Sequence, residues 1–294
     1  MTEPSDSLSI HLHALRARTG NATLVLAASN IEIDLLHPLY DALRAIDRTP
    51  RLDVVVYLRG GEVNAARRLA LLFHEFADSL RFLVPHYCES SGTLMALAAH
   101  EIVAGPLAIF SPIDPHLNAA EGQNGGPGAL SSQDIRLFAN MSRDWFGHGA
   151  EDAAMKALPL LCDNIFPTTL TSFYRATLEM EAIGLELQAR RSPNGDAESH
   201  AAIVRKLLYD YHSHQFALTG EDMRALGLPV VRDAALESIA WDIACDVRRL
   251  IGPESRESLQ GDWRDALIAT PESMRVRRRS RERPFGVWET PEAV

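Results

Sequence analysis

Lysine is nearly absent from this chain. Of the 29 basic residues among its 294, only Lys156 and Lys206 are lysines. Arginine stays protonated near neutral pH, whereas lysine can lose its proton when it is buried. Chemistry that needs an unprotonated side-chain amine is therefore confined to two positions.

Cysteines and long apolar runs are also scarce. The three cysteines, Cys88, Cys162 and Cys245, are too scattered for a disulfide framework, and none forms a Cys-x-x-Cys pair. No apolar run approaches the roughly 20 residues that span a bilayer. The polar start, residues 1–9, lacks the basic and apolar regions of a signal peptide. We therefore expect a cytoplasmic protein with reduced thiols and no membrane span.

Positive charge is in deficit as well, since the formal net charge is −10. This balance argues against nucleic-acid binding, and the one strongly basic run, at 275–283, is of a kind that is usually solvated. The 46% apolar and 23% charged content is that of an ordinary globular protein. We expect an N-terminal extension at 1–20, one large domain at 21–252 and a charged, flexible tail at 253–294.

From Thr23 onward, short β-branched runs alternate with helical patterns, as in stacked βα units. Strands are predicted at 23–28, 53–58 and 81–84, and the intervening helices favour parallel pairing. A Gly- and Asn-rich loop is expected at 118–132. The other predicted elements are helices at 34–47, 62–79, 94–99, 135–146, 152–161, 167–189, 198–213, 219–227 and 234–250, and strands at 101–104, 107–110 and 228–231.

Two serines, Ser90 and Ser91, stand between the strand at 81–84 and the next helix. A hydroxyl there lies at the carboxyl edge of the sheet, where α/β folds place their sites, and the unpaired N–H groups that open the helix can bind an oxyanion. Local reasoning does not choose between the two serines, and either could merely cap the helix. One βα unit earlier, Gly60-Gly61 either allows close backbone approach to a substrate or makes an ordinary tight turn.

Five segments, in this order, resemble the serine dehydrogenase proteinase family. They are Leu58-Arg59-Gly60-Gly61, His86-Tyr87-Cys88-Glu89-Ser90-Ser91-Gly92-Thr93-Leu94, Ala98-Ala99-His100-Glu101-Ile102-Val103, Gly105-Pro106 and Ser111-Pro112-Ile113-Asp114-Pro115. The stretch 214–230 also resembles the family's closing helix and strand. This family belongs to the Clp-fold serine peptidases and is similar to the signal-peptide peptidase A group. The resemblance implies an α/β, Clp/crotonase-like superhelix of stacked βα (ββα) units with C-terminal helices.

Matching the family's serine elbow residue by residue implies that Ser90 is the nucleophile of a serine protease. The backbone N–H groups of Gly61 and Ser91 would form the oxyanion hole. Two residues depart from the family's pattern, because Arg59 replaces a proline and Ser91 replaces a glycine. The resemblance further implies a homo-oligomer that acts on polypeptides and needs no cofactor.

Lys156 is the first choice of general base, because 152–158 resembles a family helix that carries a lysine. Signal-peptide peptidase A and its relatives use a Ser/Lys dyad, in which an unprotonated lysine accepts the serine proton. The plain alternative for Lys156 is an exposed helix lysine. Lys206 and His116 are the alternative bases, and His86 and His100 are further candidates, since histidine is the commonest general base.

No metal site is expected, because His212 and His214 would lie on different faces of a helix. Cys88 is expected to pack as a small apolar residue. The chain lacks a Gly-x-Gly-x-x-Gly fingerprint, so no dinucleotide is predicted. Two other functions stay open, namely a catalytically silent Clp-fold oligomeric scaffold and an acyl-CoA enzyme of the crotonase type.

Overall fold

The structure is a computed structural model that describes residues 4–118, 129–146, 149–252, 258 and 261–291. Its helices are α1 (Pro4–Thr19), the short 3-10 turn η1 (Ile33–Leu35), α2 (Leu36–Ile46), α3 (Val63–Phe76), α4 (Ser91–Ala96), α5 (Ser132–Phe146), α6 (Ala150–Asn164), α7 (Pro167–Arg191), α8 (Ala197–Tyr209), α9 (Gly220–Ala225) and α10 (Ala234–Ile251). Its strands are β1 (Ala22–Ala28), β2 (Thr49–Leu58), β3 (Ala77–Val84), β4 (Tyr87–Cys88), β5 (Glu101–Ala104), β6 (Ile109–Phe110), β7 (His116–Asn118), β8 (Ala129–Ser131), β9 (Val230–Val231), β10 (Trp263–Thr270), β11 (Ser273–Arg279) and β12 (Val287–Glu289).

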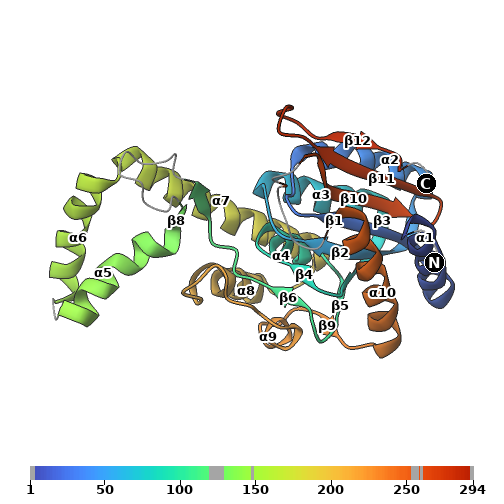
Figure 1. Ribbon diagram of the computed structural model, residues 1–294. Coiled ribbons are helices and arrows are strands. Elements are labelled where there is room, and N and C mark those ends of the chain that lie inside the picture. The colour runs from blue at the N-terminus through green and yellow to red at the C-terminus, as the bar shows by residue number, and fades with distance from the viewer. Residues whose placement is uncertain (1–3, 119–128, 147–148, 253–257, 259–260, 292–294) are drawn as a thin grey trace.

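A mixed sheet with the order β12-β11-β10-β1-β2-β3-β5-β9 is the centre of the fold (Figure 1). Within this sheet β1, β2, β3, β5 and β9 pair in parallel in that order, and the short β4 pairs in parallel with both β2 and β6. The predicted α/β class and the parallel pairing of the strands are confirmed. The carboxyl ends of the parallel strands therefore meet at one edge of the sheet, where β2 leads to Gly60 and β4 leads to Ser90.

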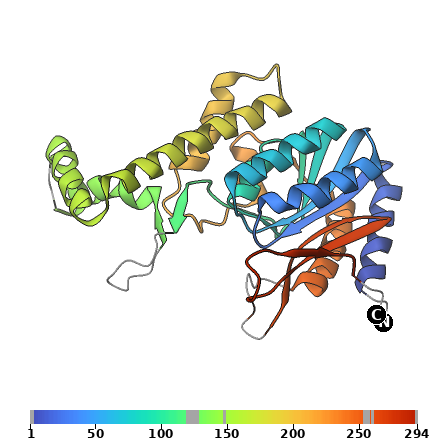
Figure 2. The same ribbon diagram turned by 90° about the horizontal axis from the view of Figure 1, so that it is seen from above.

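Helices cover both faces of the sheet (Figures 1 and 2). On one face α2, α3 and α4 bury their apolar sides against the strands, and parts of α7 and α8 join the same core. On the other face α1 and α10 pack together, with Leu8, Leu12 and Leu15 of α1 fully buried. The expected N-terminal extension is thus a helix built into the second core, because its leucines recur at the spacing of one helical face.

The C-terminal segment differs from the expected flexible tail. β10 pairs antiparallel with β1, and β11 and β12 extend the sheet beyond it. Arg277, inside the basic run, has no exposed surface and donates to both carboxylate oxygens of Asp265 at 2.8 and 2.9 Å. It also donates to Asp34 at 2.6 Å. A charge can be buried in this way only when it is paired, and these carboxylates supply the pairing.

A helical arm, made of the described residues 132–146 and 149–178, projects from the layered body (Figures 1 and 2). In it α6 packs on α5, and α7 continues from the arm into the body. Large apolar side chains along the arm stay exposed, namely Trp145, Phe146, Met155, Leu158, Leu160, Phe166, Tyr174 and Leu178. The loop predicted at 118–132 lies mostly outside the described residues, and its described ends pair as β7 and β8.

None of the helices in the described ranges is both long enough and apolar enough to cross a membrane.

Candidate active site

Ser90 occupies a sharp turn between β4 and α4. Its backbone has φ 55° and ψ −119°, a left-handed conformation that costs a non-glycine residue energy and that surrounding structure must hold in place. Its side chain makes no capping hydrogen bond to the helix, so the simple cap considered from the sequence is not what this serine provides. A serine on a strained strand-to-helix turn is the usual geometry of an exposed nucleophile.

The neighbouring Ser91 differs from Ser90 in its accessibility. Ser91 is fully buried, whereas Ser90 is partly exposed. The Ser91 hydroxyl has no hydrogen-bond partner among the described residues. Burial therefore favours Ser90 over Ser91 as the serine that a substrate could reach.

Hydrogen bonds hold the Ser90 turn against the following strand. The Ser90 N–H donates to Ser111 Oγ at 2.7 Å, and the Ser111 N–H donates to Thr93 Oγ1 at 3.1 Å. Thr93 Oγ1 donates to the carbonyl of Cys88 at 2.6 Å. This network links β4 and α4 to Ser111, the residue after β6, and it explains how the strained backbone of Ser90 is maintained.

Gly60 and Gly61 bring a second turn against Ser90. A β-carbon added to Gly60, at φ +98°, would lie 2.9 Å from Ser90 Cβ and 3.3 Å from its Oγ. At Gly61, φ +143°, a β-carbon would lie 2.3 Å from the carbonyl oxygen of Ile31. Both positions therefore require glycine, one because of the serine and the other because of the adjacent chain.

The N–H of Gly61 faces away from the Ile31 chain. Ile31 bonds to the groups on either side of Gly61, accepting from the Glu62 N–H and donating to the Gly60 carbonyl, each at 2.8 Å. In a parallel ladder the N–H of the residue between those groups points to the opposite edge. That edge is the side on which β4 leads to Ser90, as an oxyanion donor would require.

A charged pair lies directly beside the two turns. Arg59 Nε is 3.2 Å from Glu89 Oε2, and both side chains are about a quarter exposed, at 25% and 24%. The guanidinium carbon of Arg59 lies 4.2 Å from the centre of the Tyr87 ring. Arg59 precedes Gly60 and Glu89 precedes Ser90, so the pair spans the same gap as the Gly60–Ser90 contact.

Cys88 is excluded as a nucleophile. It is fully buried, and burial raises the pKa of its thiol far above neutral pH. Since the thiolate is the reactive form, this cysteine is inert at ordinary pH. The expectation that it packs as an apolar residue is confirmed.

Both lysines are exposed, and Lys156 also lies far from Ser90. Lys156, on α6 of the arm, is 60% exposed and has a 3.9 Å ion pair with Asp152. Both views place α6 at the far end of the arm, away from α4 (Figures 1 and 2). Lys206 is exposed on α8. Within one chain, Lys156 therefore does not meet Ser90.

The candidate histidines lie in different segments, and the contacts of two of them are described. His116 opens β7, but its side chain lies outside what the structure describes. His86 stacks on Tyr87 with ring centres 3.8 Å apart. His100 accepts a hydrogen bond from the Leu80 N–H at 3.0 Å through Nδ1, which ties it to the backbone of β3.

One hydrogen-bonded pair of side chains had no signal in the sequence. His214 Nδ1 lies 2.9 Å from Asp114 Oδ1, and the Asp114 side chain is only 1% exposed. The two residues are 100 positions apart, and the antiparallel bridge between Phe110 and Leu218 brings their segments together. Only the register of that bridge, not a local motif, could have indicated this pair.

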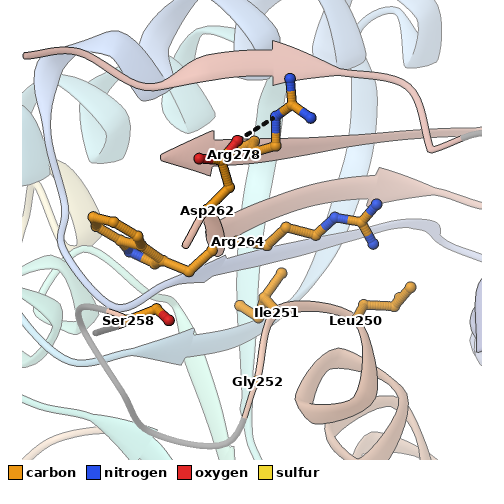
Figure 3. Close-up of a pocket in the computed structure, with 8 residues that line it drawn as sticks. Leu250, Ile251, Gly252, Ser258, Asp262, Arg264 and Arg278 are labelled. Carbon is orange, nitrogen blue, oxygen red and sulfur yellow. Dashed lines mark ion pairs between the residues drawn. The ribbon is translucent and has the colours of Figure 1, made fainter. Parts of the chain in front are cut away.

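A pocket of about 370 Å³ lies elsewhere, beside the end of α10 and the strands β10 and β11 (Figure 3). Arg278 in its wall pairs with Asp262 at 3.7 Å. None of the candidate catalytic residues lines it. In the described residues, no three histidine, cysteine or acidic side chains gather as a metal site.

The structure is that of an α/β protein with a serine of positive φ at a strand-to-helix turn. Residues 29–123 match the family described as ClpP-like SDH-type serine proteinase, and this confirms the resemblance seen in the sequence over those residues. The match contains Gly60, Gly61, Ser90 and Ser91, but not Lys156 or Lys206.

Two uncharacterised proteins of Methanocaldococcus jannaschii are similar to part of the chain. MJ0137 is 36% identical over 87 residues, which is 30% of this chain and 30% of that protein. MJ1495 is 36% identical over 80 residues, which is 26% of this chain and 27% of that protein. The alignments thus span less than a third of these relatives.

Two solved structures of the 1510-N membrane-bound stomatin-specific protease are also similar in shape. One is a serine-to-alanine mutant with a TM-score of 0.43 and 16% identity, covering 70% of this chain and 77% of that one. The other is a lysine-to-alanine mutant in complex with a substrate peptide, with a TM-score of 0.42 and 16% identity, covering 70% and 73%.

Proposed function

We propose that this protein is a cytoplasmic serine peptidase that hydrolyses peptide bonds through an acyl-enzyme on Ser90. The Ser90 Oγ attacks the substrate carbonyl, a general base takes its proton, and the N–H groups of Gly61 and Ser91 stabilise the oxyanion. The base returns the proton to the leaving amine, and water then hydrolyses the acyl-serine. The observation that carries this proposal is the left-handed, partly exposed Ser90 packed against Gly60.

The match of residues 29–123 to a family of serine proteinases supports the same assignment. Labelling with a fluorophosphonate probe tests it directly, because the probe forms a covalent bond only with an activated serine. We expect the native protein to be labelled and the Ser90→Ala variant to be inert. The matched control is Ser91→Ala, which should still be labelled. A folded, assembled protein that takes up no label would instead favour the catalytically silent scaffold.

The general base is proposed to be Lys156 of another copy of the chain. Lys156 sits on the arm and away from Ser90 of its own chain, so a dyad requires a second copy. The exposed apolar side chains of the arm support such an assembly, because a surface of this kind is usually covered by a partner. Burial in the assembly would also lower the pKa of the lysine, as a general base requires.

A mixing experiment tests the shared site. Ser90→Ala copies keep Lys156, and Lys156→Ala copies keep Ser90, so neither variant alone should be labelled. When the two are mixed and reassembled, label should return only on the Lys156→Ala copies. Lys206→Ala is the control and should be labelled by itself. Full labelling of Lys156→Ala alone would exclude Lys156 as the base and return the choice to Lys206 or His116.

A further inference from the structure

Each turn of the site is tied to another segment, the Gly60–Gly61 turn to Ile31 and the Ser90 turn to Ser111, but among the described residues no strand pairing joins the two turns to each other. The Arg59 N–H donates to the Ala28 carbonyl at 3.1 Å, and the Glu89 N–H donates to the Leu58 carbonyl at 2.9 Å. Beyond these bonds both turns adopt positive φ, at Gly60 with +98° and at Ser90 with 55°. The distance between Gly60 and Ser90 therefore depends on contacts other than the ladder.

Arg59 and Glu89 connect these turns through their side chains. Each is the last residue before its turn, and their 3.2 Å ion pair crosses from one to the other. Because both groups are only about a quarter exposed, at 25% and 24%, water screens this pair less than it screens a fully exposed one.

Tyr87 fixes the orientation of the arginine. The guanidinium lies 4.2 Å from the centre of the Tyr87 ring, a distance at which a cation and an aromatic ring attract each other. Tyr87 in turn packs edge-on against the buried Tyr57 of β2, with ring centres 5.5 Å apart. A planar guanidinium can stack and pair at once, which a lysine ammonium cannot reproduce.

We propose that Arg59 is a positioning residue: paired with Glu89 and stacked on Tyr87, it holds the Gly60–Gly61 turn at a fixed distance from Ser90. This inference rests on the proposed function, because the role of Arg59 is to keep the oxyanion donor of the glycine turn, the Gly61 N–H, at a fixed distance from Ser90. Arg59 itself touches no reacting atom. It acts through the backbone that follows it.

The kinetic test compares variants by fluorophosphonate labelling, separating the maximal labelling rate from the probe concentration at half-saturation. Arg59→Ala and Glu89→Ala should each lower the maximal rate about tenfold, since small displacements of reacting groups are costly, and leave half-saturation within about twofold. The double variant should be no slower than either single one, because both remove the same pair. Arg59→Lys should fall between native and alanine rates.

The control is Arg232→Ala, which breaks another arginine–glutamate pair, the 2.6 Å contact with Glu237. It should label at the native rate. Thermal unfolding identifies any variant that fails to fold, in which case Glu89→Gln replaces Glu89→Ala. Additive losses in the double variant, or native labelling by Arg59→Ala, would refute the positioning role while leaving Ser90 as the nucleophile.

Amide hydrogen exchange tests the same inference without any activity. In Arg59→Ala, exchange in the segments around Gly60–Gly61 and Ser90 should accelerate, whereas Arg232→Ala should leave both unchanged. If the native protein takes up no label but the exchange result holds, the proposed function fails, and the role of the Arg59–Glu89 pair in holding the two turns together remains. If exchange at the two turns does not change, Arg59 does not hold them together.

Discussion

Gly60 and Ser90 are in direct contact, and the contact leaves no room for a side chain on the glycine. A β-carbon at position 60 would lie 2.9 Å from Ser90 Cβ, closer than such atoms approach in proteins. The contact links the end of β2 to the start of α4 across 30 residues of sequence. It therefore makes the glycine turn and the serine turn one structural unit.

Gly60→Ala should displace Ser90 and suppress labelling. The new methyl group must push the serine away, and a displacement of this kind at a reacting group costs about 100-fold in rate. Fluorophosphonate labelling of folded protein is the measurement. Gly20→Ala is the control, because Gly20 has a comparable φ of +71° and no heavy atom within 4 Å of the added carbon. Equal effects of the two substitutions would mean that backbone strain, not the contact with Ser90, is responsible.

Arg277→Met should destabilise the whole fold. The substitution removes one of the two arginines that pair with the buried Asp265, leaving Arg279 at 2.8 Å, and it removes the arginine that pairs with Asp34. Breaking a buried ion pair from one side typically costs about 3–5 kcal/mol. Urea unfolding measures the loss. The control on the same strand is the exposed Arg275→Met, which should stay within about 0.5 kcal/mol of the native protein. A loss below about 1 kcal/mol for Arg277→Met would mean that the ion pairs of Arg277 contribute little to the stability of the fold.

The same arginine shows where sequence patterns stop being informative. The alternation of β-branched runs and amphipathic helices predicts β1, β2, β3 and β5 well, because those strands are buried and their apolar pattern is local. β11 contains four arginines and looks solvated. Its main partners, Asp265 and Asp34, lie 12 and 243 residues away from Arg277, and no local pattern contains that information.

The candidate site also has some features that the sequence predicts and others that only the structure shows. The strand-to-helix position of Ser90 and the glycines before α3 follow from short motifs. The choice between Ser90 and Ser91 depends on burial, and the place of Lys156 depends on the direction in which the arm leaves the body, so both required the three-dimensional arrangement. The pairing of His214 with Asp114 likewise depends on the register of two distant segments.

Stability should fall as the pH drops below the ordinary histidine pKa of 6.5, because of His74 and His100. Burial lowers the pKa of His74, and nearby Arg190 lowers it further. Burial also lowers the pKa of His100, with added contributions from His74, Arg191 and Arg51. The unfolded chain therefore binds protons at a pH at which the folded chain does not, so acid favours unfolding.

Urea unfolding between pH 5.5 and 8 measures the slope of the free energy of unfolding against pH. Above about pH 7.5 both states have neutral imidazoles and the slope should vanish. The double substitution His74→Gln and His100→Asn should reduce the change in the free energy of unfolding with pH below about 6.5. In this variant Gln can still donate to the Ala98 carbonyl, as His74 does at 3.0 Å, and Asn can still accept from the Leu80 N–H. An unchanged slope would assign the effect to other groups.

Ser91→Ala should leave labelling intact and should not reduce stability. The Ser91 hydroxyl is fully buried and has no hydrogen-bond partner in the part of the chain that the structure describes. Removing an unsatisfied buried hydroxyl recovers part of its desolvation cost, which is about 1 kcal/mol or more. The backbone N–H of residue 91, the proposed oxyanion donor, is unaffected by the change. Urea unfolding and fluorophosphonate labelling are both informative here, and loss of labelling equal to that of Ser90→Ala would mean that the nucleophile has been assigned to the wrong serine.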